Sequence, residues 1–191
     1  MKVTERTPIR RVALAVGRAL AERGIRAVLT GGACASIHSG GRYLSEDLDF
    51  VLEGRVALAE LDAAMADAGF SREANRYHHP RSRFWVEFPR GPLAVGADLD
   101  LIPVHLDEAE ALTLALSPTD SCRDRLSAFY HWSDRQSLGV ALEIARRHEV
   151  DLDLIRRWSA KEGHAARCEE FLRDLSRPDS RARVRGRDRR A

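Results

Sequence analysis

Residues 25–52 read IRAVLTGGACASIHSGGRYLSEDLDFVL, and this stretch decides the fold of the chain. It opens with a short apolar run rich in β-branched side chains, which predicts a buried strand that ends in a tight turn at Gly31 and Gly32. A short helix is expected over residues 33–38. Residues 47–52 then alternate acidic and apolar side chains, as a half-buried strand does. The stretch therefore predicts a strand, a glycine turn, a short helix and a second strand.

Asp47 and Asp49 are the residues of this stretch best suited to chemistry. At a spacing of two on a strand, both carboxylates point to the same face, with Cα atoms about 6–7 Å apart. Like charges at that distance repel each other, and a cation between them relieves the repulsion. Mg²⁺ and Mn²⁺ prefer oxygen ligands and leave positions open for phosphate oxygens. We therefore predict a divalent metal site at this pair.

The glycine pair precedes a Ser-x-Asp-x-Asp motif that begins at Ser45. Glycines, which lack Cβ atoms, let the backbone approach a triphosphate, and the following helix directs free amide groups and the positive end of its dipole toward the anion. The Ser45 hydroxyl is able to donate to a phosphate oxygen. The alternatives are an ordinary turn at Gly31 and Gly32, and a Ser45 that caps the turn before the aspartates.

Periodicity extends this pattern in both directions along the chain. Apolar residues at helical spacing predict amphipathic helices over 8–23 and 55–68. Further strands are expected over 83–88 and 98–104. From about residue 107 the pattern becomes helical, with helix starts at the capping residues Ser117, Asp134 and Asp151.

These elements predict an α+β fold, in which a small mixed sheet with flanking helices is followed by a helical C-terminal subdomain. Residues 1–106 form the sheet-containing domain, residues 107–176 the helical subdomain, and residues 177–191 a basic, flexible tail. The tail carries seven arginines and two aspartates in a chain of net charge +2, so the first 176 residues are mildly acidic. Clustered arginines neutralise phosphates, which slightly favours a nucleic-acid partner.

Composition excludes several classes of protein. The chain has 191 residues and 44% hydrophobic content, enough for one compact core. Cys34, Cys122 and Cys168 are widely spaced, which argues against a disulfide scaffold or a structural zinc site. No stretch approaches the roughly 18 apolar residues of a membrane helix, and the first residues lack the apolar core of a signal peptide. We therefore expect a soluble cytoplasmic protein without membrane contact.

The segment LTGGACASIHSGGRYLSEDLDFVL resembles the signature of the nucleotidyltransferase superfamily, whose fold is that of DNA polymerase beta. It is similar in particular to bacterial nucleotidyltransferase domains related to AbiEii-type toxins. The resemblance implies the nucleotidyltransferase fold and a nucleoside triphosphate held by Gly31, Gly32 and Ser45. It also implies metal ions bound by Asp47 and Asp49, with Mg²⁺ or Mn²⁺ as the cofactor.

In that family an acidic residue on a neighbouring strand completes the site. Within residues 83–88 the apolar side chains occupy one face, which leaves Glu87 and Trp85 on the other face. Asp98 and Asp100 are the competing choices, because they repeat the two-residue spacing on another expected strand. We favour Glu87 as the third metal ligand and as the group that accepts a proton during the reaction.

The helical part also resembles the C-terminal region of such bacterial proteins, in which a basic residue and an acid line the nucleotide cleft. Arg125 and Asp134 are the nearest matches, and the resemblance implies that they bind the nucleotide. The alternative is that Asp124, Arg125, Asp134 and Arg135 form a set of helix caps and salt bridges that holds two helices together.

The resemblance implies an enzyme that transfers a nucleoside monophosphate from a nucleoside triphosphate to an acceptor hydroxyl and releases pyrophosphate. The acceptor is open between tRNA, a protein side chain and a small molecule, and the family implies a toxin–antitoxin system with an antitoxin partner. The alternative function is a non-catalytic protein that uses the nucleotidyltransferase fold for protein or RNA binding. Metal-dependent nucleotide binding separates the two.

Overall fold

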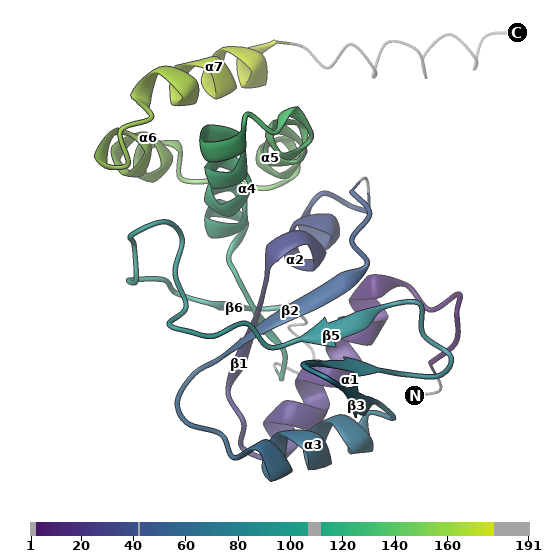
Figure 1. The fold of residues 1–191 in the computed structure, drawn as a ribbon. Coiled ribbons are helices and arrows are strands. Elements are labelled where there is room, and N and C mark those ends of the chain that lie inside the picture. Colours follow the sequence, from purple (N-terminus) through teal and green to yellow (C-terminus); the bar gives the residue numbers. More distant parts are fainter. Residues whose placement is uncertain (1–2, 42, 107–111, 178–191) are drawn as a thin grey trace, which may run out of the picture.

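The computed structural model describes residues 3–41, 43–106 and 112–177. In this part of the chain, seven helices accompany one seven-stranded mixed sheet, which confirms the predicted α+β class (Figure 1). The strands, in the sheet order β3-β4-β5-β2-β1-β7-β6, are β1 (Ala27–Thr30), β2 (Asp47–Leu52), β3 (Ser71–Glu73), β4 (Arg76–His78), β5 (Trp85–Glu87), β6 (Val104–His105) and β7 (Leu114–Ala115). The helices are α1 (Ile9–Glu22), α2 (Gly31–His38), α3 (Leu58–Asp67), α4 (Pro118–Trp132), α5 (Arg135–Arg147), α6 (Leu152–Lys161) and α7 (Ala165–Ser176).

Strand β1 leads directly into helix α2, and this junction carries the glycine pair. β1 pairs antiparallel with β2, with Thr30 opposite Asp49. Gly31 has a φ of +62°, a conformation that favours glycine, and it is already the first residue of α2. The prediction of a tight turn before a helix over 33–38 is therefore wrong in detail. Because Gly31 alone makes the change of direction, the helix begins two residues earlier.

The sheet combines both kinds of strand pairing. β2 pairs in parallel with β5, and β1 pairs in parallel with β7, whereas the other neighbouring strands are antiparallel. Strand β2 coincides with the predicted strand over 47–52, and β5 is shorter than the predicted strand over 83–88. The sequence pattern does not predict β3 and β4, because residues 71–78 are mostly polar and lack a clear alternation.

Helices α1 and α3 contact each other and pack against the sheet (Figure 1). Helix α1 lies within one residue of the predicted 8–23 at each end and buries Val12, Val16 and Leu20, as its periodicity predicts. The Tyr77 hydroxyl of β4 donates to Asp62 of α3 at 2.8 Å. This bond identifies the face of the sheet that α3 covers.

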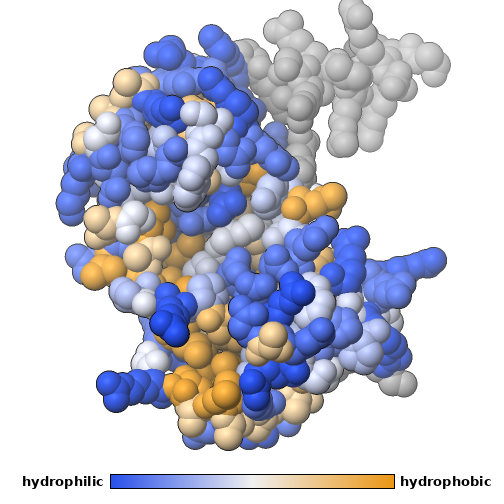
Figure 2. All heavy atoms as spheres, in the orientation of Figure 1, coloured by the Kyte–Doolittle hydropathy of each residue, from blue (hydrophilic) through white to orange (hydrophobic). Residues whose placement is uncertain are grey.

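Helices α4 to α7 form a separate layer beyond α2 (Figure 1). The predicted helix starts are confirmed, because Ser117, Asp134 and Asp151 each accept a hydrogen bond from a backbone N–H in the first turn of α4, α5 and α6, at 2.7 to 3.0 Å. Figure 2 shows that the outer surface of this layer is mostly hydrophilic, as expected of helices that bury one apolar face. Among the described residues, no helix is both long enough and apolar enough to span a membrane.

The sheet continues past the predicted boundary at residue 106. Leu114–Ala115 form β7, which lies between β1 and β6, so the expectation of helix from about residue 107 is wrong there. Two residues are too few to display the alternation that marks a strand. Residues 107–111, next to the predicted boundary, lie outside the described part of the chain, as does the basic tail from residue 178.

The strand expected over 98–104 is also wrong for most of its length, since only Val104–His105 belongs to β6. Leu99 and Ile102, whose apolar side chains suggested a half-buried strand, are 59% and 81% exposed. The backbone N–H of Asp100 donates to Asp98 Oδ1 at 3.1 Å. Local bonds of this kind compete with strand pairing.

Candidate functional site

The three predicted carboxylates lie on the sheet face opposite the one that α3 covers. Asp47 and Asp49 are on β2, and Asp49 is paired in register with Glu87 on the neighbouring parallel strand β5. Residues paired in register point to the same face, and neighbouring strands lie about 4.8 Å apart. All three residues are partly buried. The predicted placement of Glu87 on the face of the two aspartates is thereby confirmed.

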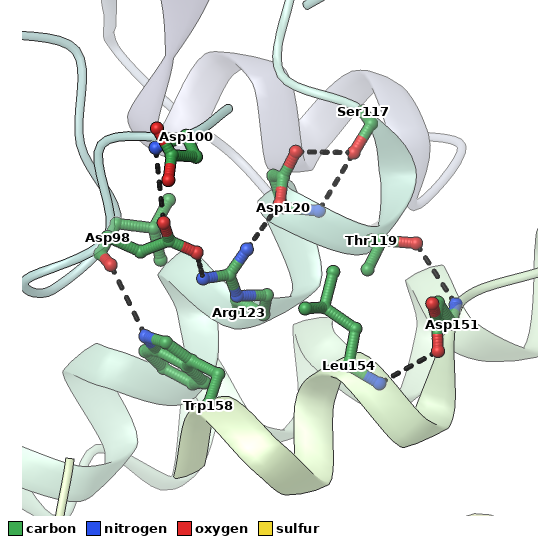
Figure 3. A network of polar contacts seen from close by, with 10 residues as sticks. Asp98, Asp100, Ser117, Thr119, Asp120, Arg123, Asp151, Leu154 and Trp158 are labelled. Atoms are coloured by element: carbon green, nitrogen blue, oxygen red, sulfur yellow. Dashed lines mark hydrogen bonds and ion pairs between the residues drawn. The ribbon is translucent and has the colours of Figure 1, made fainter. Parts of the chain in front are cut away.

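Asp98 and Asp100, the competing third ligands, belong to a different cluster (Figure 3). The Asp98 carboxylate binds the guanidinium group of Arg123 on α4. Arg123 is 1% exposed, and it also binds Asp120 at 2.7 Å. The hydrogen bond from Arg123 lowers the pKa of Asp98 below its ordinary value. The charge of Asp98 is therefore already neutralised by a buried arginine, which favours Glu87 as the third acid.

Gly31 lies directly against Asp49. A Cβ atom on Gly31 would lie 2.5 Å from Asp49 Oδ2, closer than Cβ atoms come to other atoms in proteins. The Thr30 hydroxyl, one residue earlier, donates to the backbone carbonyl of Asp49 at 3.3 Å. Glycine is thus needed at position 31 for two reasons, the positive φ and the close approach of the carboxylate.

Gly32 faces Ser45 in the same way. A Cβ atom on Gly32 would lie 2.8 Å from Ser45 Oγ and 3.1 Å from a ring carbon of Tyr43. The Ser45 hydroxyl donates to the backbone carbonyl of Asp47 at 2.9 Å. This bond is the capping role that the sequence left open as an alternative, and it keeps the hydroxyl between the glycine and the first aspartate. Gly31, Gly32 and Ser45 therefore lie next to the carboxylates.

The pKa of Asp49 depends on its burial and on the charged side chains around it. Burial, followed by the negative charges of Glu87, Asp47 and Asp124, raises the pKa of Asp49 to about 6. The positive charge of Arg125 acts in the opposite direction but does not cancel these effects. Burial is the largest cause and the like charges add to it, so a cation beside Asp49 would favour the ionised form of this carboxyl.

Helix α4 brings Arg125 and Asp124 to this group. The Arg125 guanidinium binds Asp124 Oδ2 through Nη2 at 2.6 Å and Nε at 3.0 Å, and its side chain is 14% exposed. Burial alone would lower the pKa of Arg125, but the charge of Asp124, the hydrogen bonds to Asp124 and the charge of Asp134 raise it above its ordinary value. Arg125 therefore stays positively charged beside the acidic group.

Asp134 serves as a helix cap. Its carboxylate accepts hydrogen bonds from the backbone N–H groups of Gln136 at 2.9 Å and Ser137 at 3.2 Å, and from the Ser137 hydroxyl at 2.7 Å. These bonds, the one from the Ser137 hydroxyl first, lower the pKa of Asp134. Since both carboxylate oxygens are occupied, the structure supports the capping interpretation of Asp134 over a direct nucleotide contact.

The described residues contain no group of three or more His, Cys, Asp or Glu side chains that forms a ready metal site. Asp47, Asp49 and Glu87 instead share a face through strand register, without convergence of their side chains on one point. Their carboxylate oxygens are the donors that Mg²⁺ and Mn²⁺ prefer. The charge of Arg125 lowers the pKa of Asp49 but does not offset burial and the neighbouring carboxylates, which raise it. In donor type and in charge, these residues fit a divalent cation.

A separate cavity of about 250 Å³ lies between α1, β1 and the strands β6 and β7. Small and apolar residues such as Gly17, Ile25 and Leu114 line most of it, together with His105. None of the predicted site residues lines this cavity. The candidate site is therefore on the sheet face at the end of β1 and not in the cavity.

Two residues of the group, Asp124 and Tyr43, are not predicted by the sequence pattern. Asp124 lies in a helix rich in charged residues, where a carboxylate is usually part of a salt bridge. Tyr43 precedes the Ser-x-Asp-x-Asp motif, and we include it in the site because its ring lies close to Gly32. The one available signal is that Asp124 directly precedes the predicted basic residue Arg125.

The candidate site thus combines a glycine junction, three carboxylates on one sheet face and an arginine from α4. Comparisons of the chain with protein-family models, with curated proteins and with solved structures found no match.

Proposed function

We propose that the chain is a metal-dependent nucleotidyltransferase with the nucleotidyltransferase fold. It moves a nucleoside monophosphate from a nucleoside triphosphate to an acceptor hydroxyl and releases pyrophosphate. The observation that carries the proposal is the position of Gly31 against Asp49, with 2.5 Å between a Cβ atom at position 31 and Asp49 Oδ2. A backbone suited to phosphate thereby adjoins a carboxylate suited to a metal ion.

The start of helix α2 supports triphosphate binding. The first N–H groups of a helix have no acceptor within the helix, and its dipole favours an anion there. Thr30, at the N-cap position of α2, makes no capping bond with its side chain. The side-chain hydrogens of Gly31 and Gly32 leave room for phosphate oxygens. Arg125 adds a positive charge beside the same group.

Asp47, Asp49 and Glu87 are the residues that would hold the divalent cation. When bound, such an ion lowers the pKa of an attacking hydroxyl and neutralises charge on the triphosphate. The chain keeps the carboxylates on one face by strand register. Burial and the neighbouring carboxylates raise the pKa of Asp49 to about 6, so the protonated fraction of this carboxyl grows as the pH falls through that region.

The proposed reaction balances without a covalent protein intermediate. The acceptor oxygen forms a bond to the α-phosphorus of the triphosphate while the bond from that phosphorus to the bridging oxygen of pyrophosphate breaks. Pyrophosphate leaves with the electron pair of the broken bond. The hydroxyl proton passes to the Glu87 carboxylate and from there to solvent.

Nucleotide binding tests the proposal most directly. The thermal unfolding of the protein is measured with each of the four nucleoside triphosphates, with Mg²⁺, with Mn²⁺ and without metal. A ligand that binds only the folded state raises the Tm, by about 5–10 °C for a chain of this size at a hundredfold excess over Kd. We expect a rise that requires the metal and is largest for one triphosphate.

Two asparagine variants provide the control. Asp49→Asn should abolish the metal-dependent rise in Tm, whereas Asp98→Asn makes the same chemical change in the Arg123 cluster and should retain it. A rise that survives Asp49→Asn, or no rise with any triphosphate, would contradict the proposal. Either result would favour the alternative of a non-catalytic protein that uses this fold for binding.

A further inference from the structure

Two histidines from distant parts of the chain meet where helix α2 ends, and we name them the His38–His148 pair. His38 is the last residue of α2, and His148 directly follows α5. Their ring centroids lie 5.2 Å apart, with the rings edge to face at 86°. His38 is 8% exposed, and His148 is partly buried. Two ionisable side chains therefore share one interface, at the opposite end of α2 from the glycine junction.

Hydrogen bonds fix the protonation of both imidazoles. Nε2 of His38 lies 3.0 Å from the carbonyl oxygen of Leu116, and Nε2 of His148 lies 2.9 Å from the carbonyl oxygen of His38. A carbonyl oxygen only accepts, so each Nε2 carries a hydrogen and donates it. Within the described ranges, neither imidazole forms an ion pair with an acidic side chain. The pair therefore fits the structure in its neutral form.

These bonds join α2 to the helical layer at two places. Leu116 lies between β7 and α4, and its own N–H donates to the carbonyl of Leu29 on β1 at 3.0 Å. The bond from His38 ties the end of α2 to the start of the helix that carries Arg125, and the bond from His148 ties α2 to α5. Figure 1 shows α2 between the sheet and these helices. The pair therefore helps to hold Arg125 and the glycine junction in one arrangement.

A positive charge is unfavourable at His38. Burial lowers the pKa of His38 below its ordinary value of 6.5 and a charge on His148 lowers it further, while the bond to Leu116 acts in the opposite direction without cancelling these effects. β1 contains no charged residue, and the buried side chains of α1 are apolar. The charged groups that face α2 from the other elements do not contribute to this shift; they are Asp49 on β2, Asp124 and Arg125 on α4, and Glu143 and Arg147 on α5.

We propose that the His38–His148 pair is a pH-sensitive switch that regulates the candidate site. This inference rests on the proposed function, because it concerns the nucleotide that the site would bind. In its neutral form the pair holds α2 against α5 and the start of α4. In weak acid, protons on both imidazoles place two like charges 5.2 Å apart, and separation of the helices gives the charged rings back to water. Arg125 then leaves the carboxylate face, and the affinity for the triphosphate falls.

The direction of the pH effect follows from the folded pKa of His38. This pKa lies below the unfolded value, so the stabilisation by neutral His38 is fully present above the unfolded pKa and is lost as the pH falls through the folded pKa. Asp49 acts in the opposite direction, since the cost of its ionisation disappears in acid. Substitution of the histidine alone therefore separates the two effects.

Glutamine variants test the switch, because glutamine keeps an N–H donor but does not titrate. Thermal unfolding is measured at pH 7.5 and pH 5.5. As the pH falls, the Tm of His38→Gln should rise relative to that of the wild type by a few degrees, and His148→Gln, at the less buried position, should show the same trend. His105→Gln removes an exposed histidine from β6 and is the matched control. A Tm difference from the wild type that is independent of pH in both variants, or equal to that of the control, would overturn the switch.

Cys34 provides a local measurement of opening. It is buried in α2, and its thiol donates to the same Leu116 carbonyl at 3.7 Å. Its reaction with 4,4′-dithiodipyridine is followed by mass spectrometry of the Cys34 peptide. The ratio of the wild-type rate to the His38→Gln rate should rise several-fold between pH 7.5 and pH 5.5. Cys122, whose thiol donates to a carbonyl of α5 at 3.6 Å, is the internal control, and an equal rise there would show general unfolding and contradict the switch.

Nucleotide binding distinguishes the switch from the proposed function. The rise in Tm with each of the four nucleoside triphosphates and Mg²⁺ is measured at both pH values. It should shrink less in acid for His38→Gln than for the wild type, because Asp49 titrates in both proteins. The same decrease in both overturns the switch and leaves the proposed function standing. Acid-induced opening at Cys34 without a nucleotide effect at either pH overturns the proposed function and with it the regulatory role of the pair.

Discussion

Two arginines of helix α4, Arg123 and Arg125, lie two residues apart, and each belongs to a different cluster of acidic residues. Arg123 is 1% exposed and binds Asp98 and Asp120 (Figure 3). Arg125 binds its neighbour Asp124 and lies close enough to Asp49 to act on its charge. The Arg125 cluster also contains the other two carboxylates of the sheet face, Asp47 and Glu87.

The pKa values of the two clusters move in opposite directions. The bond from Arg123 lowers the pKa of Asp98, so this carboxylate is more stable ionised in the folded state than in the unfolded state. Burial and like charges raise the pKa of Asp49 to about 6, so folding opposes its ionisation. Ionisation of Asp98 therefore stabilises the fold. Ionisation of Asp49 lowers stability and, under our proposal, this carboxylate keeps a place for a cation.

Loss of the buried guanidinium should have the largest effect on stability. Arg123→Met leaves Asp98 and Asp120 without their cation, and removal of one partner from a buried ion pair lowers the free energy of unfolding by about 3–5 kcal/mol. Urea denaturation measures this change. Arg125→Met is the matched variant and should lose less, because Arg125 is 14% exposed and binds one carboxylate, whereas Arg123 is 1% exposed and binds two. Equal losses would show that the two clusters do not differ as described.

The glycine junction should be the next most sensitive position. Gly31→Ala combines a positive φ with a contact of 2.5 Å to Asp49, so we expect a loss of about 3 kcal/mol. Gly24→Ala measures the cost of the positive φ alone, because Gly24 has a φ of +71° and nothing lies within 4 Å of its Cβ position. That variant should lose about 1 kcal/mol. Similar losses for both would argue against the close approach of Asp49.

Asp98→Asn should lower the free energy of unfolding at pH 7 by about 1–2 kcal/mol, since it weakens a hydrogen bond to a charged group. The folded pKa of Asp98 lies below the unfolded value, so the stabilisation exists above the unfolded pKa and is lost as the pH falls through the folded pKa. The difference between variant and wild type should therefore shrink below about pH 4. Urea denaturation at pH 7 and pH 3 provides the test, and a constant difference would refute the assigned cause.

Asp49→Asn should have the smallest effect and the opposite sign. In metal-free protein the variant should be more stable than the wild type at pH 8, by on the order of 1 kcal/mol, because a partly exposed carboxyl is screened by solvent. The folded pKa lies above the unfolded one, so the cost of ionising Asp49 develops as the pH rises from about 4 to about 6 and is absent below that window. Thermal unfolding at pH 4 and pH 8 measures it. A variant that is less stable at pH 8 would count against the crowding of carboxylates around Asp49.

Strong local signals made much of the site predictable. Alternation over 47–52 predicted β2 and the shared face of its aspartates, and the same argument placed Glu87 beside them. The helix starts at Asp134 and Asp151 followed from capping residues next to apolar periodicity. These features depend on a few neighbouring residues, so one sequence is sufficient to predict them.

Features that depend on distant partners were not predictable. Residues 98–104 have a strand-like pattern, but Asp98 bonds instead to Arg123, which lies on a later helix. Asp124 joins the site because α4 packs against α2, which contacts β2, and the pattern of α4 contains nothing that indicates this. Strand β4, which contains Arg76 and His78, was not predicted because its sequence is mostly polar. In each case tertiary packing, and not local preference, decides the outcome.

The place of β7 in the sheet has a consequence for the order in which the protein assembles during synthesis. β1 finds one partner, β2, within the same short stretch, but its other partner, Leu114–Ala115, is made only after β3 to β6. Pairing of strands so far apart requires closure of a long loop before any contact forms, which slows folding. A chain that leaves the ribosome amino end first therefore keeps one side of β1 open until residue 115 has emerged. The junction of Gly31 with Asp49 can form early, while the middle of the sheet is still incomplete.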